Sequence, residues 1–238
     1  MRGVSDHTAK LLAMTLYGRR AAVNKSKFIA VTVIALTSGL LVGVVAAKLH
    51  SRRARAESCN DVPCAHFNAR LTAIESQIAQ NQAKHVYLAI GDSITEFADL
   101  PTICGRRPIN AGIGGATSAT FVELGRRLSD LSKPDFIVIA LGTNDAIHGR
   151  IDGFKDRMTN LIESLHPLPV LIVPLPPSRS VPSVGTFNAV ISSLPDPKAN
   201  SLVSVGNISD GIHLNATDYA QWKASISDAS VATVCAHL

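Results

Sequence analysis

Ser93 directly follows an uncharged run of strand-forming residues and is the first candidate for chemistry. Residues 86–90 are rich in strand-forming types, and the run stops at Gly91-Asp92, immediately before the serine. Ligands bind at the carboxyl edge of open parallel sheets, where a hydroxyl is held rigidly yet can face a crevice. The alternative is that Ser93 only caps the next helix. A serine so placed is suited to nucleophilic attack if a base lies beside it.

A candidate base lies far along the chain, in Asp210-Gly211-Ile212-His213. An aspartate and a histidine three residues apart can curl so that the carboxylate reaches one ring nitrogen while the other faces outward. The carboxylate then fixes the tautomer and stabilises the imidazolium that forms when the ring takes a serine proton. Any one of the eight histidines is more often a bystander than a base. Together these residues predict a catalytic Ser93, His213 and Asp210 for acyl transfer.

Acyl transfer also needs hydrogen-bond donors for the oxygen that becomes negative in the tetrahedral intermediate. Gly115 can bring its N–H close because it has no side chain. Asn144 follows the uncharged run 136–141 and can supply its side-chain amide. The backbone N–H of Ser93 is the third predicted donor of this oxyanion hole. A tight turn at Gly114-Gly115 and a helix cap at Asn144-Asp145 are the structural alternatives.

These residues need a scaffold that brings distant strand ends together, and residues 84–238 predict one. Strands are expected at 86–90, 108–110, 136–141, 170–173 and 202–205. Helices are expected near 118–131, 154–165, 187–194 and 217–230. Continuous apolar strands that alternate with helices indicate an α/β fold with a parallel sheet covered on both faces. Such a sheet brings Ser93, Asn144 and the Gly115 turn to one edge.

The positive charge of the chain is concentrated at its amino end. The 238 residues carry a formal net charge of +5, and residues 1–57 hold ten of the 23 Lys and Arg but only two of the 18 acidic residues. The remainder is slightly acidic and the chain is only 5% aromatic, which disfavours a phosphate-binding groove or a base-stacking surface. We therefore expect no nucleic-acid partner.

A membrane anchor is predicted near the amino terminus. Twenty residues from Phe28 to Ala47 carry no charge, enough for a helix to cross the hydrocarbon core. We assign residues 1–27 to a basic cytoplasmic tail, 28–48 to a transmembrane signal anchor and 49–83 to a partly helical juxtamembrane stalk. Six Lys or Arg precede the span and four follow it, which favours an inside amino terminus and a periplasmic or extracellular body. The alternative is a cleaved secretory leader.

The four cysteines all follow this span. Cys59 and Cys64 are close enough to close a small loop, and Cys104 and Cys235 could tie the carboxyl terminus to the loop after Ser93, although four cysteines allow three pairings. Disulfides suit an oxidising compartment. No Cys and His spacing typical of zinc is present, so a metal is not expected. No other cofactor is expected either. In the stalk, Leu71, Ile74 and Ile78 form a narrow stripe that could pack on the body or pair with a second copy.

Four segments together resemble the sequence blocks of the SGNH (GDSL-type) hydrolases. They are Gly91-Asp92-Ser93-Ile94, Asn110 to Gly115, Gly142-Thr143-Asn144-Asp145 and Asp210 to Leu214, in the family's order within residues 84–235. The resemblance implies a flavodoxin-like three-layer α/β/α sandwich and metal-free ester hydrolysis through an acyl-serine. It implies the same roles for Ser93, Asp210, His213, Gly115 and Asn144. Ala116 departs from the pattern, since many members have an aspartate there that makes a supporting hydrogen bond.

The resulting expectation is a membrane-anchored serine esterase, in the inner membrane of a bacterium, acting on a small acyl ester or an acetylated glycan. Loops 97–107 and 175–184 are expected to line its acyl pocket. One alternative is an acyltransferase that uses the same residues with a sugar hydroxyl as acceptor. Another is a tethered binding protein that has kept the fold and lost activity.

Overall fold

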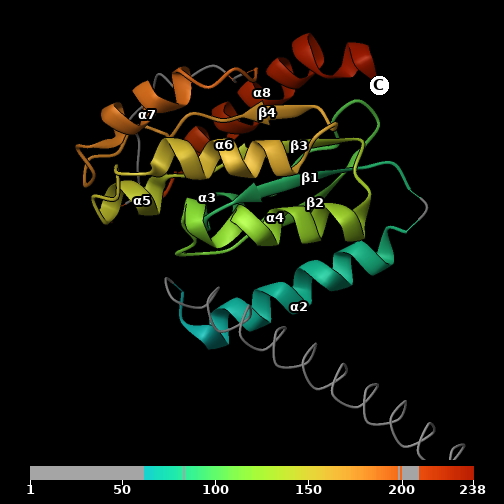
Figure 1. Cartoon of the computed structure of the whole chain (residues 1–238), viewed down its shortest axis with the longest axis horizontal. Helices are drawn as coiled ribbons and strands as arrows, with labels where there is room; N and C mark the ends of the chain where they lie inside the picture. The colour runs from blue at the N-terminus through green and yellow to red at the C-terminus, as the bar shows by residue number, and fades with distance from the viewer. Residues whose placement is uncertain (1–61, 83, 198, 200–208) are drawn as a thin grey trace, which may run out of the picture. The chain divides into compact units, whose positions relative to one another are not determined.

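Among the residues that the structure describes, four parallel strands form a sheet in the order β2-β1-β3-β4 (Figure 1). The structure, a computed structural model, describes residues 62–82, 84–197, 199 and 209–238. The strands are β1 (Val86–Gly91), β2 (Arg107–Gly112), β3 (Phe136–Ala140) and β4 (Val170–Ile172). Strands β1, β3 and β4 lie at the predicted uncharged runs, and β2 extends beyond the predicted 108–110 at both ends. Their order is that of the first four strands of a flavodoxin-like sheet.

The strand expected at 202–205 lies outside the described residues. Just before it, the chain runs beside β4. The N–H of Ile172 donates to the Pro197 carbonyl at 2.9 Å, and the Ile172 carbonyl accepts from the Ala199 N–H at 3.0 Å. In a pair of parallel strands, the N–H and the carbonyl of one residue bond to two residues of the other strand that are two positions apart, as here.

Helices of very different length precede, connect and follow the strands. They are α2 (Cys64–Gln80), α3 (Ser93–Glu96), α4 (Ser118–Ser132), α5 (Thr143–Ile147), α6 (Phe154–Ser164), α7 (Val184–Ser192) and α8 (Ala216–Thr233), with a 3₁₀ turn, η1 (Cys235–His237). Helices α4, α6 and α8 lie close to their predicted ranges, and α7 begins three residues early. The sequence did not predict α3 and α5, because four or five residues cannot display a helical period.

The sheet is buried on both faces because successive residues of a strand point to opposite sides. Leu88 and Ile90 of β1 pack in one hydrophobic cluster with residues of α2, α4, α6 and α7. Tyr87 and Ala89, which alternate with them, pack in a second cluster with Trp222 of α8. The two clusters make three layers, with α2 and α8 on opposite sides of the sheet (Figure 1).

Helix α2 packs on the sheet through the apolar stripe visible in the sequence. Leu71, Ile74 and Ile78 are buried in the same cluster as Ile109 of β2. Of the two arrangements considered for this stripe, the structure has the helix on the body. Helix α2 accordingly belongs to the same compact unit as the sheet.

A disulfide joins Cys104, in the loop after α3, to Cys235 of η1, 131 residues further along the chain. This is the predicted link between the carboxyl terminus and the loop after Ser93. Cys64 begins α2, whereas Cys59, its expected partner, is outside the described residues.

The predicted basic tail (1–27), transmembrane helix (28–48) and first part of the stalk (49–61) also lie outside the described residues. Among the residues from Val62 onward that the structure describes, no helix has the length and apolar character needed to cross a bilayer.

Candidate active site

Ser93 is the first residue of α3 and lies directly beyond the end of β1. Asp92 caps this helix, because its Oδ1 accepts a hydrogen bond from the Ile94 N–H at 3.0 Å. The interpretation of Ser93 as the helix cap is therefore wrong, and its hydroxyl is available for another partner. Gly91 is in register with Gly112 of β2 and with Ala140 of β3, so three strands end at the same edge.

The structure brings Ser93, His213 and Asp210 into one chain of hydrogen bonds. His213 Nε2 lies 2.8 Å from Ser93 Oγ, across a separation of 120 residues. On the other side of the ring, His213 Nδ1 lies 2.6 Å from Asp210 Oδ2. With the proton of the neutral ring on Nδ1, Nε2 is left to accept the serine hydroxyl proton. This is the relation between a nucleophile, a base and an orienting carboxylate.

Local backbone bonds hold the carboxylate of Asp210 in place. Its Oδ1 accepts from the N–H groups of Ile212 and His213, at 2.9 and 3.0 Å, which leaves Oδ2 for the ring. The hydrogen bond with the His213 ring, followed by the bond from the Ile212 N–H, lowers the pKa of Asp210 to about 2. The carboxylate is therefore ionised at any pH at which an esterase is assayed, and it favours a proton on Nδ1 of the ring.

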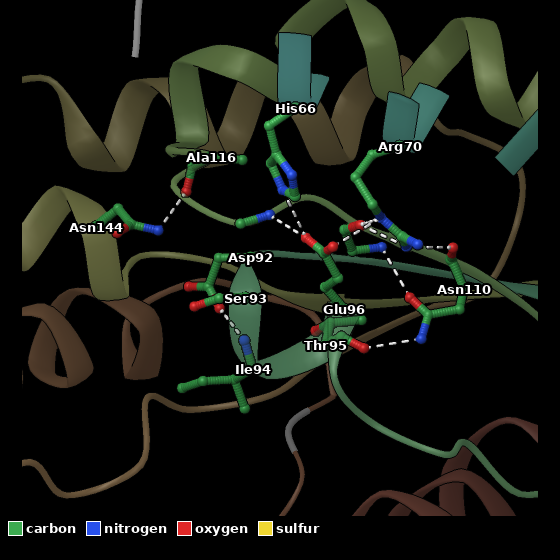
Figure 2. Close-up of polar contacts among 12 residues, drawn as sticks. His66, Arg70, Asp92, Ser93, Ile94, Thr95, Glu96, Asn110, Ala116 and Asn144 are labelled. Carbon is green, nitrogen blue, oxygen red and sulfur yellow. Dashed lines mark hydrogen bonds and ion pairs between the residues drawn. The ribbon is translucent and has the colours of Figure 1, made fainter. Parts of the chain in front are cut away.

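The three expected oxyanion donors lie at the same edge as this chain. Gly115 has φ +82°, a conformation that favours glycine. A Cβ added to its neighbour Gly114 would lie 3.7 Å from Ser93 Cβ, so this turn runs beside the nucleophile. The side chain of Asn144 donates to the Ala116 carbonyl at 3.0 Å (Figure 2). An amide has two N–H bonds, and the second is left for an oxyanion.

Ala116 takes part in the site through its backbone although its side chain differs from the family pattern. The methyl group is fully buried, and the carbonyl orients Asn144.

Sequence reasoning missed the role of Asp145, a buried carboxylate that joins helix α5 to the start of helix α4. Asp145 is 0% exposed and accepts from Ser118 at both the backbone N–H (2.8 Å) and the hydroxyl (2.7 Å). Arg157 of α6 donates to the same Ser118 hydroxyl at 2.8 Å and to Asp145 at 3.3 Å. These bonds tie α5, which carries Asn144, to the start of α4. A charged residue directly after Asn144 was the available signal, whereas nothing in the sequence singled out Arg157.

A small cavity opens at the ends of β1, β3 and β4. Its lining is mostly apolar and consists of Asp92, Ile94, Ala140, Thr143, Val173, Pro174, Leu175, Pro176 and Trp222. Leu175 and Pro176 belong to the loop expected to line the acyl pocket. From the other expected loop, the Phe97 ring lies 5.3 Å from the His213 ring and is 62% exposed. In the loop 175–184, the hydroxyls of Ser178 and Ser180 donate to the carbonyls of Gly211 and Asp210, both at 2.8 Å. Both loops therefore reach the neighbourhood of the triad.

Burial raises the pKa of Asp92 to about 6, against the opposing hydrogen bonds from the Ile94 N–H and the Thr143 hydroxyl. Because this value exceeds the ordinary 3.8, the folded protein holds the proton more tightly than the unfolded chain does. The contribution of Asp92 to the free energy of unfolding is therefore fully present below pH 4 and is lost as the pH rises through 6. The shift corresponds to about 3 kcal/mol. Relative to wild type, Asp92→Asn should therefore gain about 3 kcal/mol of stability as the pH rises from 4 to 7.

Denaturant unfolding at several pH values measures this effect. The neutral amide retains an oxygen for the Ile94 N–H, so the capping bond is preserved. Replacement of exposed Asp228 on α8 by asparagine controls for the loss of a carboxylate elsewhere. If the free energy of unfolding changed with pH by the same amount in wild type and in Asp92→Asn, the raised pKa would be contradicted.

Comparison with known proteins agrees with this geometry. The sequence model of the GDSL-like lipase/acylhydrolase family matches residues 89–220, which is more than half of the chain. No curated protein matches the chain by sequence.

Solved structures share the fold at low sequence identity. A lipase/acylhydrolase from Enterococcus faecalis is 20% identical, with a TM-score of 0.52 over 61% of this chain and 95% of that one. A carbohydrate esterase family 3 protein from Talaromyces cellulolyticus is 16% identical, with a TM-score of 0.52 over 64% and 99%. A variant of an acetyl xylan esterase from Geobacillus stearothermophilus is 15% identical, with a TM-score of 0.52 over 61% and 94%. The chain belongs to the GDSL-like lipase/acylhydrolase family and is a serine hydrolase that acts on ester bonds.

Proposed function

We propose that this chain is a membrane-tethered esterase that removes small acyl groups, acetyl groups of glycans in particular, through an acyl-serine intermediate. The observation that carries the proposal is the continuous chain of hydrogen bonds from Ser93 through His213 to Asp210. It lies beside the turn of Gly115 and the amide of Asn144. Nucleophile, base and oxyanion donors thus share one edge of the sheet.

The first half-reaction forms the acyl-enzyme. Ser93 Oγ attacks the ester carbonyl while His213 Nε2 takes the hydroxyl proton, and the carbonyl oxygen becomes negative. The N–H groups of Ser93 and Gly115 and the side-chain amide of Asn144 stabilise that oxygen. Collapse of the intermediate breaks the bond to the alcohol, which leaves with the proton from His213.

The second half-reaction releases the acid. Water replaces the alcohol in the site and gives a proton to His213 Nε2 as its oxygen attacks the acyl carbon. The second tetrahedral intermediate uses the same three donors. Its collapse breaks the bond to Ser93 Oγ, which recovers its proton from His213. The net reaction is hydrolysis of one ester to an acid and an alcohol.

Two observations support a small, acetyl-type ester. Two of the proteins that share the fold are a carbohydrate esterase and an acetyl xylan esterase. Phe97 offers an exposed aromatic face next to His213, against which a sugar ring could lie.

The uncharged segment Phe28–Ala47 supports the tether. The Cys104–Cys235 disulfide supports an oxidising compartment for the body, and hence a periplasmic or extracellular active site. Carbonate-washed membranes from cells that express the full chain should retain the intact 25.2 kDa protein. A shorter, soluble product would instead indicate a cleaved leader and a secreted enzyme.

Labelling and hydrolysis by the detergent-solubilised full chain test the activity. We expect a fluorophosphonate to label Ser93, p-nitrophenyl acetate to be cleaved faster than long-chain esters, and acetylated xylo-oligosaccharides to release acetate. Hydrolysis that falls when a sugar is added, with formation of acylated sugar, would indicate acyl transfer instead. Absence of labelling and of hydrolysis would indicate a binding protein.

Asn144→Ala should lower kcat for p-nitrophenyl acetate by about 10²- to 10³-fold, because it removes one donor to the oxyanion. Asn81 provides a matched control, since its side chain also donates to one backbone carbonyl, that of Gln77, but lies at the end of α2. Asn81→Ala should leave kcat unchanged. A tenfold or smaller loss in Asn144→Ala would exclude Asn144 as an oxyanion donor.

A further inference from the structure

Glu96 links the helix that begins with the nucleophile to the turn that carries the oxyanion donor. It is the last residue of α3, three positions after Ser93, and its side chain is only 11% exposed. Its Oε2 accepts a hydrogen bond from the Gly114 N–H at 2.6 Å (Figure 2). Gly114 directly precedes Gly115. One side chain therefore sets the separation between the two parts of the site.

Two residues of α2 hold Glu96 in this position. Arg70 Nε lies 3.3 Å from Glu96 Oε1, and His66 Nε2 lies 3.0 Å from Glu96 Oε2. Figure 2 shows both side chains descending from α2 onto Glu96 from the same side. A carboxylate with this small exposure needs such partners, since burial of an unpaired charge is costly.

Arg70 also binds the end of β2 directly. Its Nε and Nη2 both donate to the Gly112 carbonyl, at 2.9 and 2.8 Å. The approach of α3 to this strand end is close, because a Cβ on Gly112 would lie 2.2 Å from the Glu96 backbone nitrogen. The start of the turn, the end of α3 and α2 therefore form one connected unit.

The charges in this unit bear on catalysis. Glu96 places a carboxylate near a site where negative charge develops, and like charges repel. Arg70 offsets that carboxylate, and the Gly114 N–H and His66 bind it further. If Arg70 is removed, both the orientation of the turn and the charge balance beside the oxyanion hole change.

We propose that Glu96 is a positioning residue for the turn that contains Gly114 and the oxyanion donor Gly115. Helix α2, acting through Arg70 and His66, then contributes to kcat by holding Glu96 in place. The proposal rests on the function proposed above. Helix α2 precedes residues 89–220, to which the family match is confined, so this support is a feature of the chain beyond its family segment. The segment taken from the sequence as a stalk thus helps to arrange the active site.

Kinetics of variants in the full chain test the proposal. Glu96→Ala should lower kcat for p-nitrophenyl acetate by about 10- to 100-fold with KM within about twofold, because a misplaced donor weakens transition-state binding. Glu96→Gln retains an oxygen for the Gly114 N–H and should keep kcat within about threefold of wild type. Arg70→Ala should lower kcat by about tenfold. The double variant should lose less than the product of the single losses, because the two residues act together.

Glu75 provides the matched control on the same helix. It forms an ion pair with Arg127 of α4 but does not touch the turn. Glu75→Ala should leave kcat unchanged, even if it lowers the melting temperature. An equal loss of kcat in Glu75→Ala and Arg70→Ala would overturn the proposal, since α2 would then act only by docking.

The remaining outcomes are also decisive. A folded Glu96→Ala protein with wild-type kcat would overturn the inference while leaving the esterase function intact. If that variant does not fold, Glu96→Asp replaces it, since its shorter side chain keeps the charge but does not reach Gly114. A wild-type chain that hydrolyses no ester, or a Ser93→Ala variant as active as wild type, would remove the proposed function itself.

Discussion

Ser93→Ala is expected to lower kcat for p-nitrophenyl acetate by about 10⁴- to 10⁶-fold. The variant retains the oxyanion donors and His213, so the residual rate reports attack by water in an otherwise intact site. Fluorophosphonate labelling should disappear completely, because the only atom that forms the covalent bond has been removed. Near-wild-type turnover in this variant would exclude the acyl-serine route.

Ser132 provides a control for the loss of a serine hydroxyl outside the active site. Its hydroxyl donates to the Leu128 carbonyl at 2.7 Å at the end of α4. Ser132→Ala removes a hydroxyl of the same size from a part-buried position away from the site. It should keep full turnover and full labelling.

Asp210→Asn is expected to lower kcat by about 10⁴-fold through the tautomer of His213. The N–H groups of Ile212 and His213 both point at Oδ1, so the oxygen of the new amide must stay there and its NH₂ group must face the ring. That NH₂ group donates to Nδ1, which moves the ring proton to Nε2 and removes the acceptor for the Ser93 hydroxyl. The loss should appear in kcat with little change in KM.

A second histidine and aspartate pair in the same chain provides the control for Asp210→Asn. Asp135 Oδ2 lies 2.9 Å from His85 Nδ1, just before β3 and β1 begin, at the opposite edge of the sheet from Ser93. Asp135→Asn alters the same kind of contact outside the site and should leave kcat unchanged. If Asp210→Asn kept more than a tenth of wild-type turnover, Asp210 would not be the residue that orients His213.

The sequence predicted the strands and most of the long helices because both depend on local burial. A parallel strand covered on both faces must be uncharged along its whole length, and the runs at 86–90 and 136–141 have this property. Ser93 and Asn144 were found for the same reason, since each follows such a run. Asp210 and His213 were found because their contact needs only three residues of chain.

The contacts that hold the site together were not visible in this way. Glu96 meets Gly114 across 18 residues and His66 across 30, and Asp145 meets Ser118 across 27. None of these residues belongs to a periodic pattern, and a polar residue on a helix most often faces solvent. Their partners are decided by how α2, α3 and α4 cross the strand ends.

The sequence by itself therefore determined the parallel α/β fold and the chemistry at its edge, because alternating burial and short-range spacing are written in consecutive residues. Only the tertiary structure decided that Asp92 rather than Ser93 caps α3, that Cys104 pairs with Cys235, and that α2 packs on the sheet. It also decided that Arg70 of α2 meets the Gly112 carbonyl and the Glu96 carboxylate. Each of these outcomes depends on which of several chemically suitable groups lies within about 3 Å of another. That choice is made only when distant segments fold against one another.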